Sequence, residues 1–201
     1  MKILHLSDTH GKHRKITDMP PADVLVHSGD STLSGGDMEA LDVIEWLCDL
    51  PYKHKLFIAG NHDDCMLDAS LEGLPDDVHY LSDSGITIDG ISFYGAPMFA
   101  VFDGEELKEV EHYEQIPDNT DILITHRPPL AILDSIDDHI HYGSSILLDK
   151  VSNIKPRMHL FGHVHSAYGT IGWKGITFCN AGLTDWKYDI QYSPQLLEIN
   201  I

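Results

Sequence analysis

The stretch that decides the fold reads KILHLSDTH and runs from Lys2 to His10. Its first half, Lys2–Leu6, is a mainly apolar run that is typical of a short buried β-strand. The chain then turns polar within a few residues, at Asp8, Thr9 and His10. The stretch therefore predicts a strand whose carboxyl end carries side chains that can bind a ligand.

The rest of the first half repeats this arrangement. Asp23–His27 is a second β-like run that ends in Ser-Gly-Asp, and Lys55–Ala59 is a third that ends in Gly-Asn-His-Asp. Between them, Met38–Leu50 has apolar residues close to helical spacing, and Pro51 ends that helix. Short apolar strands separated by a helix favour parallel pairing through right-handed crossovers.

The second half predicts a second set of strands and helices. Gly85–Tyr94 is predicted to form a hairpin that turns at Asp89-Gly90. The remaining predicted segments are helices over 104–113 and 144–154, and strands over 121–125, 158–161, 169–173, 176–179 and 195–201. We expect two sheets packed face to face with helices outside, in a single domain over residues 1–201, because no linker separates the halves.

Five polar clusters each follow the carboxyl end of a predicted strand. They are Asp8-Thr9-His10, Gly29-Asp30, Gly60-Asn61-His62-Asp63, His126 and Gly162-His163-Val164-His165. Open α/β sheets place their binding sites at this edge, where loops let side chains converge and strands hold them rigid. Any one cluster is also typical of a turn or of solvated histidines, so it is the combination that indicates a site.

The clusters supply seven potential metal ligands. They are Asp8, Asp30, Asn61, His10, His126, His163 and His165. One transition ion binds about four to six ligands, so seven suits two ions that share a bridging carboxylate. Nitrogen and oxygen ligands without thiolate favour Mn, Fe, Zn, Co or Ni. Two such ions, about 3.5–4 Å apart, form a clamp for in-line displacement at phosphorus.

The composition is that of a soluble globular protein with an acidic surface. The 201 residues include 32 Asp and Glu against 13 Lys and Arg, which gives a net charge of −19. This balance argues against long nucleic acids and anionic membranes as partners, but bound metal ions would still attract a small phosphate substrate. Three widely spaced cysteines, no signal-like segment and no apolar run of membrane-spanning length indicate a cytoplasmic setting.

The clusters resemble the motif blocks of the calcineurin-like metallophosphoesterase superfamily. The nearer resemblance is to its metallophosphoesterase-domain-containing (MPPED-like) branch. It is carried by LHLSDTHG from Leu4, IAGNHD from Ile58, IPDNTDILITHRPPL from Ile116 and KPRMHLFGHVHSAYGT from Lys155. The resemblance covers nearly the whole chain and implies an α/β fold, a four-layered α/β/β/α sandwich of two mixed sheets flanked by helices.

The resemblance also implies a role for each ligand. Asp30 would bridge two divalent ions, with Mn²⁺ as the expected metal. The ligand sets would be Asp8, His10 and His165 for one ion, and Asn61, His126 and His163 for the other. Both histidines of the last block are present, which favours two complete metal sites.

Three further residues are expected to act on the substrate or beside it. His62 would contact the substrate phosphate, next to Asn61, or protonate the leaving alkoxide. Asp63 would hold the His62 ring, as a carboxylate commonly fixes an imidazole. Arg127 stands where the MPPED-like pattern often has Gly; it would bind phosphate or stack on a base, or else be solvated or paired with an acid.

The expected reaction is hydrolysis of a phosphodiester by a metal-bridging hydroxide, with His62 assisting departure of the alcohol. The resemblance makes cyclic nucleotides (2′,3′- or 3′,5′-) and aryl phosphodiesters the leading small-molecule substrates. Two alternatives stay open: a phosphomonoesterase or protein phosphatase on the same bimetal core, and a non-catalytic scaffold with the same fold. The aromatic residues Tyr168, Trp186 and Tyr188, with Asn180, are equally consistent with a base pocket and with packing. The sequence carries no signal of oligomeric state.

Overall fold

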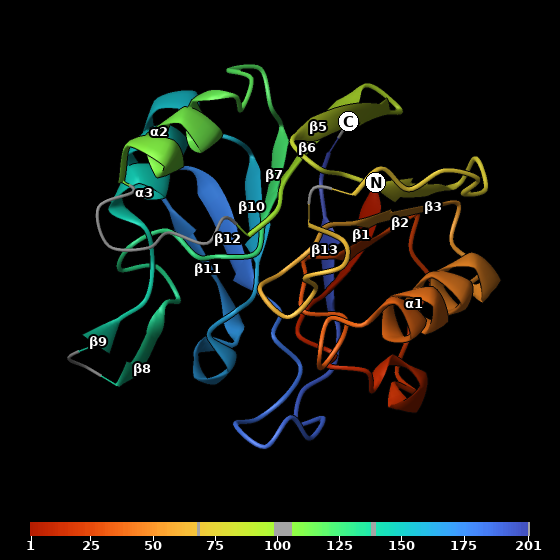
Figure 1. Ribbon diagram of the computed structural model, residues 1–201. Helices are drawn as coiled ribbons and strands as arrows, with labels where there is room; N and C mark the ends of the chain where they lie inside the picture. The colour runs from red at the N-terminus through yellow and green to blue at the C-terminus, as the bar shows by residue number, and fades with distance from the viewer. Residues whose placement is uncertain (68, 99–105, 138–139, 201) are drawn as a thin grey trace.

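Two mixed sheets form the middle of the protein (Figure 1). The structure is a computed structural model, and it describes residues 1–67, 69–98, 106–137 and 140–200. The first sheet has the order β13-β1-β2-β3-β4, in which only β13 runs antiparallel to its neighbour. Its strands are β1 (Lys2–Leu6), β2 (Val24–His27), β3 (His54–Phe57), β4 (Val78–Tyr80) and β13 (Gln195–Glu198).

The second sheet has the order β11-β12-β10-β7-β6-β5, with parallel strands in the centre and antiparallel strands at both edges. Its strands are β5 (Ser84–Ile88), β6 (Ile91–Ala96), β7 (Ile122–Thr125), β10 (Met158–Phe161), β11 (Gly169–Trp173) and β12 (Ile176–Asn180). A separate small hairpin pairs β8 (Ser135–Asp137) with β9 (Ile140–His141).

Three helices in the described part of the chain flank the sheets. They are α1 (Asp37–Asp49), α2 (Glu106–Glu114) and α3 (Ser145–Ile154). Figure 1 shows α1 on the outer side of the first sheet, and α2 and α3 together on the outer side of the second. Among the described residues, no helix is both long and apolar enough to span a bilayer.

The alternation of side chains along the strands explains this layering. In β1, Ile3 belongs to a core between the sheets, together with Val26 of β2 and Ile124 of β7. The neighbouring residue Leu4 faces the other way and packs in the cluster that holds Leu47 of α1. Because side chains alternate between the two faces of a strand, a strand that is apolar on both faces can be covered by a sheet and by a helix at once.

The structure confirms the predicted fold class of an α/β/β/α sandwich. The predicted strands over 2–6 and 158–161 have their predicted bounds, and the Asp89-Gly90 hairpin joins β5 to β6. The helix predicted over 104–113 is described only from Glu106 onward, and the strand predicted over 195–201 ends at Glu198, with residue 201 outside the described residues. The sequence did not predict β4, β8 or β9, because two or three residues are too few to show a strand periodicity.

Candidate metal centre

The five polar clusters all lie just beyond the carboxyl ends of strands. Those strands are β1, β2 and β3 in the first sheet and β7 and β10 in the second (Figure 1). The side chains come together into one group, which we call the centre. Its members are Asp8, His10, Asp30, Asn61, His126, His163 and His165.

The backbone of the centre is strained. Asp8, His10, Asp30 and His163 have positive φ angles of 56, 43, 54 and 69°. Residues other than Gly rarely adopt this left-handed conformation, and each instance costs on the order of 1–3 kcal/mol. Such strain persists where the surrounding structure demands it, and it concentrates at functional sites.

Two glycines let the strand-end loops approach each other. A Cβ atom on Gly60 would lie 2.2 Å from Asp30 Oδ1, and one on Gly162 would lie 2.1 Å from Asp8 Oδ2. Real Cβ atoms do not come this close to another atom, so any side chain at either position would displace a carboxylate of the centre. These glycines follow strands of different sheets, so the close approach joins both sheets to the site.

The first half of the centre is built around Asp8. Its Oδ1 atom lies 3.2 Å from His165 Nε2, and His165 Nε2 lies 3.3 Å from His10 Nε2. The two carboxylate oxygens of Asp8 also accept the backbone N–H of His163. Asp8, His10 and His165 thus bring three ligand atoms within 4.8 Å of one another, close enough to hold a metal ion.

The second half is built around His126. Its Nε2 atom lies 3.1 Å from Asn61 Oδ1, and Asn61 Oδ1 lies 2.9 Å from His163 Nδ1. Asp30 lies between the halves, with Oδ2 at 3.3 Å from His126 Nε2 and 3.8 Å from His10 Nε2. Asp30, His126 and His163 form another group that could hold a metal ion.

The hydrogen bonds behind two histidines fit a bound cation. His126 Nδ1 donates to the carbonyl of Ser28 at 2.9 Å, and His165 Nδ1 donates to the carbonyl of Asp185 at 3.1 Å. With Nδ1 as the nitrogen that carries the proton of the neutral ring, Nε2 is free to present its lone pair to a metal ion in the centre. Carbonyls that hold metal-binding histidines in this way are typical of metal sites.

The carboxylates and histidines of the centre shift one another's pKa values. Asp8 and Asp30 are buried, yet the neighbouring histidines hold the pKa of each carboxyl below its usual value, against the effect of burial. Burial alone would lower the pKa of His126, but the Asp30 and Asp8 carboxylates raise it to about 10. Burial lowers the pKa of His163 to about 4. Two buried carboxylates require positive charge nearby. Protonated His126 provides it when no metal is bound, and a divalent cation at Nε2 would replace that proton.

His62 lies beside the centre, with its ring 4.7 Å from that of His10 between centroids. Its backbone N–H donates to Asp30 Oδ1 at 2.8 Å, which ties the residue to the middle of the centre. Its Nδ1 atom donates to the carbonyl of Leu33 at 2.9 Å. The Leu33 carbonyl therefore fixes the ring and leaves Nε2 as the nitrogen that can exchange a proton.

The prediction that Asp63 holds the His62 ring is wrong. The buried Asp63 carboxylate accepts hydrogen bonds from the backbone N–H groups of Ser31, Thr32 and Gly60 and from the hydroxyls of Ser31 and Thr32. Within the described residues, none of its bonds reaches the His62 ring. Asp63 instead joins the loop after β2 to the loop after β3, and so sets the positions of Asp30 and Asn61.

This role predicts a stability defect for Asp63→Ala. The substitution leaves several buried donors without an acceptor, so we expect it to lower the free energy of unfolding by about 3 kcal/mol or more. Urea unfolding of the metal-free protein measures the change. The neighbouring Asp64 is exposed, so Asp64→Ala is a matched control and should change stability by less than about 0.5 kcal/mol. Equal stability of the two variants would contradict this role.

The sequence left open whether Arg127 binds phosphate, stacks on a base, is solvated or pairs with an acid. In the structure it pairs with an acid. Its Nη1 atom lies 3.2 Å from Glu109 Oε1, and its Nε donates to the carbonyl of Tyr142 at 3.0 Å. The guanidinium thus links α2 to the segment that precedes α3.

Sequence reasoning missed the carbonyls that hold the histidine rings, because a backbone carbonyl carries no sequence signal. It also gave no preference to Tyr188, although the Tyr188 ring lies 4.3 Å from that of His10 between centroids. Aromatic residues near the C-terminus were the available signal, but packing explained them equally well.

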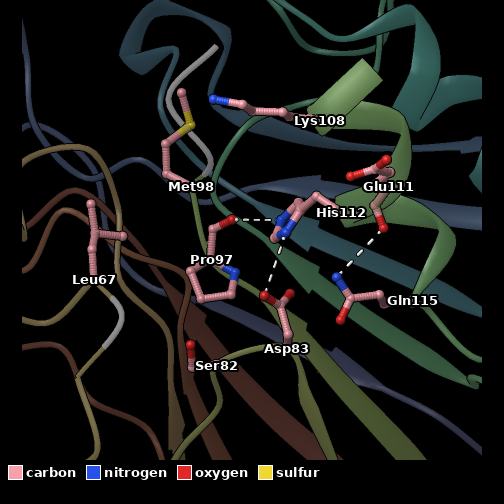
Figure 2. A pocket seen from close by; sticks show the side chains of 9 residues that line it. All are labelled: Leu67, Ser82, Asp83, Pro97, Met98, Lys108, Glu111, His112 and Gln115. Carbon is pink, nitrogen blue, oxygen red and sulfur yellow. Dashed lines mark hydrogen bonds and ion pairs between the residues drawn. The ribbon is translucent and has the colours of Figure 1, made fainter. Parts of the chain in front are cut away.

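Several cavities are lined by described residues, and one of them adjoins the centre. The cavity of about 720 Å³ is lined by His163 and His165 together with aromatic residues. Another, of about 420 Å³, is shown in Figure 2, where His112 lies between the carbonyl of Pro97 and the carboxylate of Asp83. Among the described residues, no member of the centre lines this second cavity.

The sandwich and the centre between its sheets together define a metallophosphoesterase-type fold. A solved crystal structure superposes with a TM-score of 0.66 and covers 90% of both chains, at 15% sequence identity. A family model described as calcineurin-like phosphoesterase matches residues 1–167. The chain belongs to this calcineurin-like phosphoesterase family, as the sequence predicted.

Named relatives match over almost the whole chain. A UPF0046 protein of Caenorhabditis elegans is 34% identical over 96% of this chain and 73% of its own length. Metallophosphoesterase domain-containing protein 1 of Homo sapiens is 33% identical over 98% of this chain and 71% of its own length. The predicted resemblance to the MPPED-like branch is therefore confirmed. The family binds divalent metal ions, and its membership supports the hydrolysis of phosphoesters.

Proposed function

We propose that the protein hydrolyses phosphodiesters with two divalent metal ions held in the centre. The observation that carries the proposal is the position of Asp30, whose Oδ2 atom lies within 3.8 Å of a histidine from each half of the centre. A carboxylate between two sets of nitrogen and oxygen ligands is what a pair of ions about 3.5–4 Å apart needs.

The proposed ligand sets follow the two halves of the centre, with Asp30 bridging. They are Asp8, His10 and His165 for one ion, and Asn61, His126 and His163 for the other. Mn²⁺ is the first metal to test, and Fe, Zn, Co and Ni suit the same donors. When bound, the ions would polarise the phosphoryl group and activate water as the nucleophile.

His62 supplies the proton chemistry of the proposed reaction. Because Nδ1 is held by the Leu33 carbonyl, Nε2 is the atom that would donate to a phosphoryl oxygen or protonate the departing alkoxide. Asn61, the neighbour of His62 in sequence, places its side-chain carbonyl oxygen 3.1 Å from His126 Nε2 and 2.9 Å from His163 Nδ1, where it could share an ion with both. Asp63 acts only by holding the loops that carry these residues.

The proposed substrates are small phosphodiesters: 2′,3′- or 3′,5′-cyclic nucleotides and aryl diesters. Membership of the MPPED-like branch supports this choice. The net charge of −19 disfavours long nucleic acids and anionic membrane surfaces, because each phosphate outside the centre would meet a negative field. A cytoplasmic location and a single domain over residues 1–201 fit such a substrate and form part of the proposal.

The alternatives make different use of the same centre. A phosphomonoesterase or protein phosphatase would share every ligand, whereas a non-catalytic scaffold would not need both halves intact. All seven ligands and His62 are present and gathered, which favours an enzyme.

Metal dependence is the direct test of the proposal. We expect Mn²⁺-loaded protein to hydrolyse bis-p-nitrophenyl phosphate, and metal removal by a chelator to lower the rate by about 10³-fold, because the ions provide both nucleophile activation and charge neutralisation. Release of p-nitrophenol measures the rate, and added Mn²⁺ should restore it. Undiminished hydrolysis after chelation would reject the metal mechanism. Faster hydrolysis of p-nitrophenyl phosphate would favour the monoesterase alternative.

A further inference from the structure

The loop from Thr184 to Ile190 is anchored directly to the centre. The Thr184 hydroxyl donates to the backbone carbonyl of Asp8 at 3.0 Å, and the carbonyl of Asp185 accepts from His165 Nδ1 at 3.1 Å. At the far end of the loop, Asp189 forms an ion pair with Lys12 at 2.6 Å. The loop is therefore held at a fixed distance from the proposed ligands.

This loop places one aromatic ring over three histidines. The ring of Tyr188 lies 4.3 Å from His10, 5.7 Å from His62 and 6.0 Å from His165, between centroids. Its backbone has a φ of 61°, which is a genuine outlier for a bulky side chain. Asp185 supports the turn, since its Oδ1 atom accepts the backbone N–H groups of Lys187 and Asp189. The Tyr188 backbone is therefore strained, and the contacts of the loop keep its ring beside the centre.

The cavity beside the centre continues from this ring and is mostly apolar. Trp186, Tyr188 and Tyr142 line it with aromatic faces, and Ile136 and Val164 add aliphatic surface. Trp186 is 80% exposed and Ile136 59% exposed, which is unusual for large apolar side chains, and Lys187 Nζ lies 4.7 Å from the centroid of the Trp186 ring. His163 and His165 also line it, so a group in this cavity would lie next to whatever the centre holds.

The charges around the cavity restrict its occupant. Among the described residues that line it, none is Lys or Arg, and Asp185 adds a negative charge. A second phosphate would therefore meet no cation among the described residues that line the cavity. A neutral, planar, apolar group fits better, because tryptophan and tyrosine rings offer stacking surfaces to such groups.

We propose that the Thr184–Ile190 loop forms a subsite in which Trp186 and Tyr188 stack on an aromatic substituent of the phosphoester, either a nucleobase or an aryl ring. The inference rests on the proposed function and makes these two residues determinants of substrate specificity. They bind the substituent and have no part in the cleavage of the phosphorus–oxygen bond.

Phosphonates test the subsite without turnover, because the enzyme cannot hydrolyse their carbon–phosphorus bond. Calorimetry on the Mn²⁺-loaded protein should give dissociation constants for phenylphosphonate, cyclohexylphosphonate and methylphosphonate. We expect phenylphosphonate to bind more tightly than cyclohexylphosphonate. Trp186→Ala and Tyr188→Asn should each weaken phenylphosphonate by about tenfold, the usual loss for one stacked ring, and change methylphosphonate less than twofold.

The variants are chosen to separate stacking from folding. Asn tolerates a positive φ, so Tyr188→Asn removes the ring without adding strain, and Tyr188→Phe should bind phenylphosphonate as the wild type does. Trp173 is the matched control, since it is also exposed and also carries a lysine over its ring, but it lies on β11 at the amino end of β12. Trp173→Ala should change no dissociation constant.

Each contrary result has its own meaning. An equal loss for phenyl- and methylphosphonate in Trp186→Ala would overturn the subsite, as would cyclohexylphosphonate that binds as tightly as phenylphosphonate. If wild-type protein with Mn²⁺ binds none of the three, the proposed metal centre fails and the subsite fails with it. If methylphosphonate binds tightly, and Trp186→Ala and Tyr188→Asn bind phenylphosphonate as tightly as the wild type does, the proposed metal centre is kept and the subsite alone is rejected.

Discussion

Asp30→Asn is expected to lower kcat/KM for bis-p-nitrophenyl phosphate by about 10³-fold or more. Loss of a residue that only holds a metal ligand commonly lowers metal affinity or activity by about 10–100-fold. Asp30 contacts both halves of the centre directly, so its loss should have a larger effect. Its substitution removes a charge that both ions would share, so metal content measured by elemental analysis should fall from about two ions per chain towards one or none.

The substitution is designed to leave the fold intact. Asn tolerates the left-handed backbone that Asp30 adopts, and its carbonyl can still accept the backbone N–H of His62. Asp18→Asn, at an exposed position away from the centre, is the control and should keep both metal content and rate. Full activity in Asp30→Asn with two bound ions would show that Asp30 does not bridge, and the proposed mechanism would then be wrong.

The gathering of the centre could be predicted because it follows from backbone geometry. Parallel strands place their carboxyl ends along one edge of a sheet. The clusters after β1, with Asp8 and His10, and after β10, with His163 and His165, could therefore be assigned to one site from the sequence. The left-handed backbone at Asp8, His10 and His163 could not be predicted in this way. Strands that are apolar on both faces indicated the layers, because each such strand has to be covered on both sides.

The role of Asp63 could not be predicted because its partners are distant in sequence. Side chains of adjacent residues diverge, so a carboxylate next to a histidine cannot readily bond to that ring. Asp63 reaches Ser31 and Thr32 instead, about one βαβ unit earlier in the chain. The position of Tyr188 has a similar explanation, since it depends on contacts between the loop after β12 and the loop after β1.

His62→Ala is expected to keep both metal ions and to lower kcat by about 10²–10⁴-fold, the range of a single general acid. The ring is held by the Leu33 carbonyl and not by the proposed ligands, so its removal should not open the metal sites. His54→Ala, at the amino end of β3, is the control and should change kcat little, because β3 separates it from the centre.

The leaving group tells protonation apart from a purely electrostatic contribution. If His62 protonates the departing alkoxide, the loss in His62→Ala should be larger for phenyl esters than for p-nitrophenyl esters, because p-nitrophenolate departs without needing a proton. An equal loss for both esters would limit His62 to charge stabilisation on the phosphoryl oxygens. His62 also lies within ligand distance of His10 and Asp30, so a variant that loses metal would identify it as a ligand and would contradict its role as the acid.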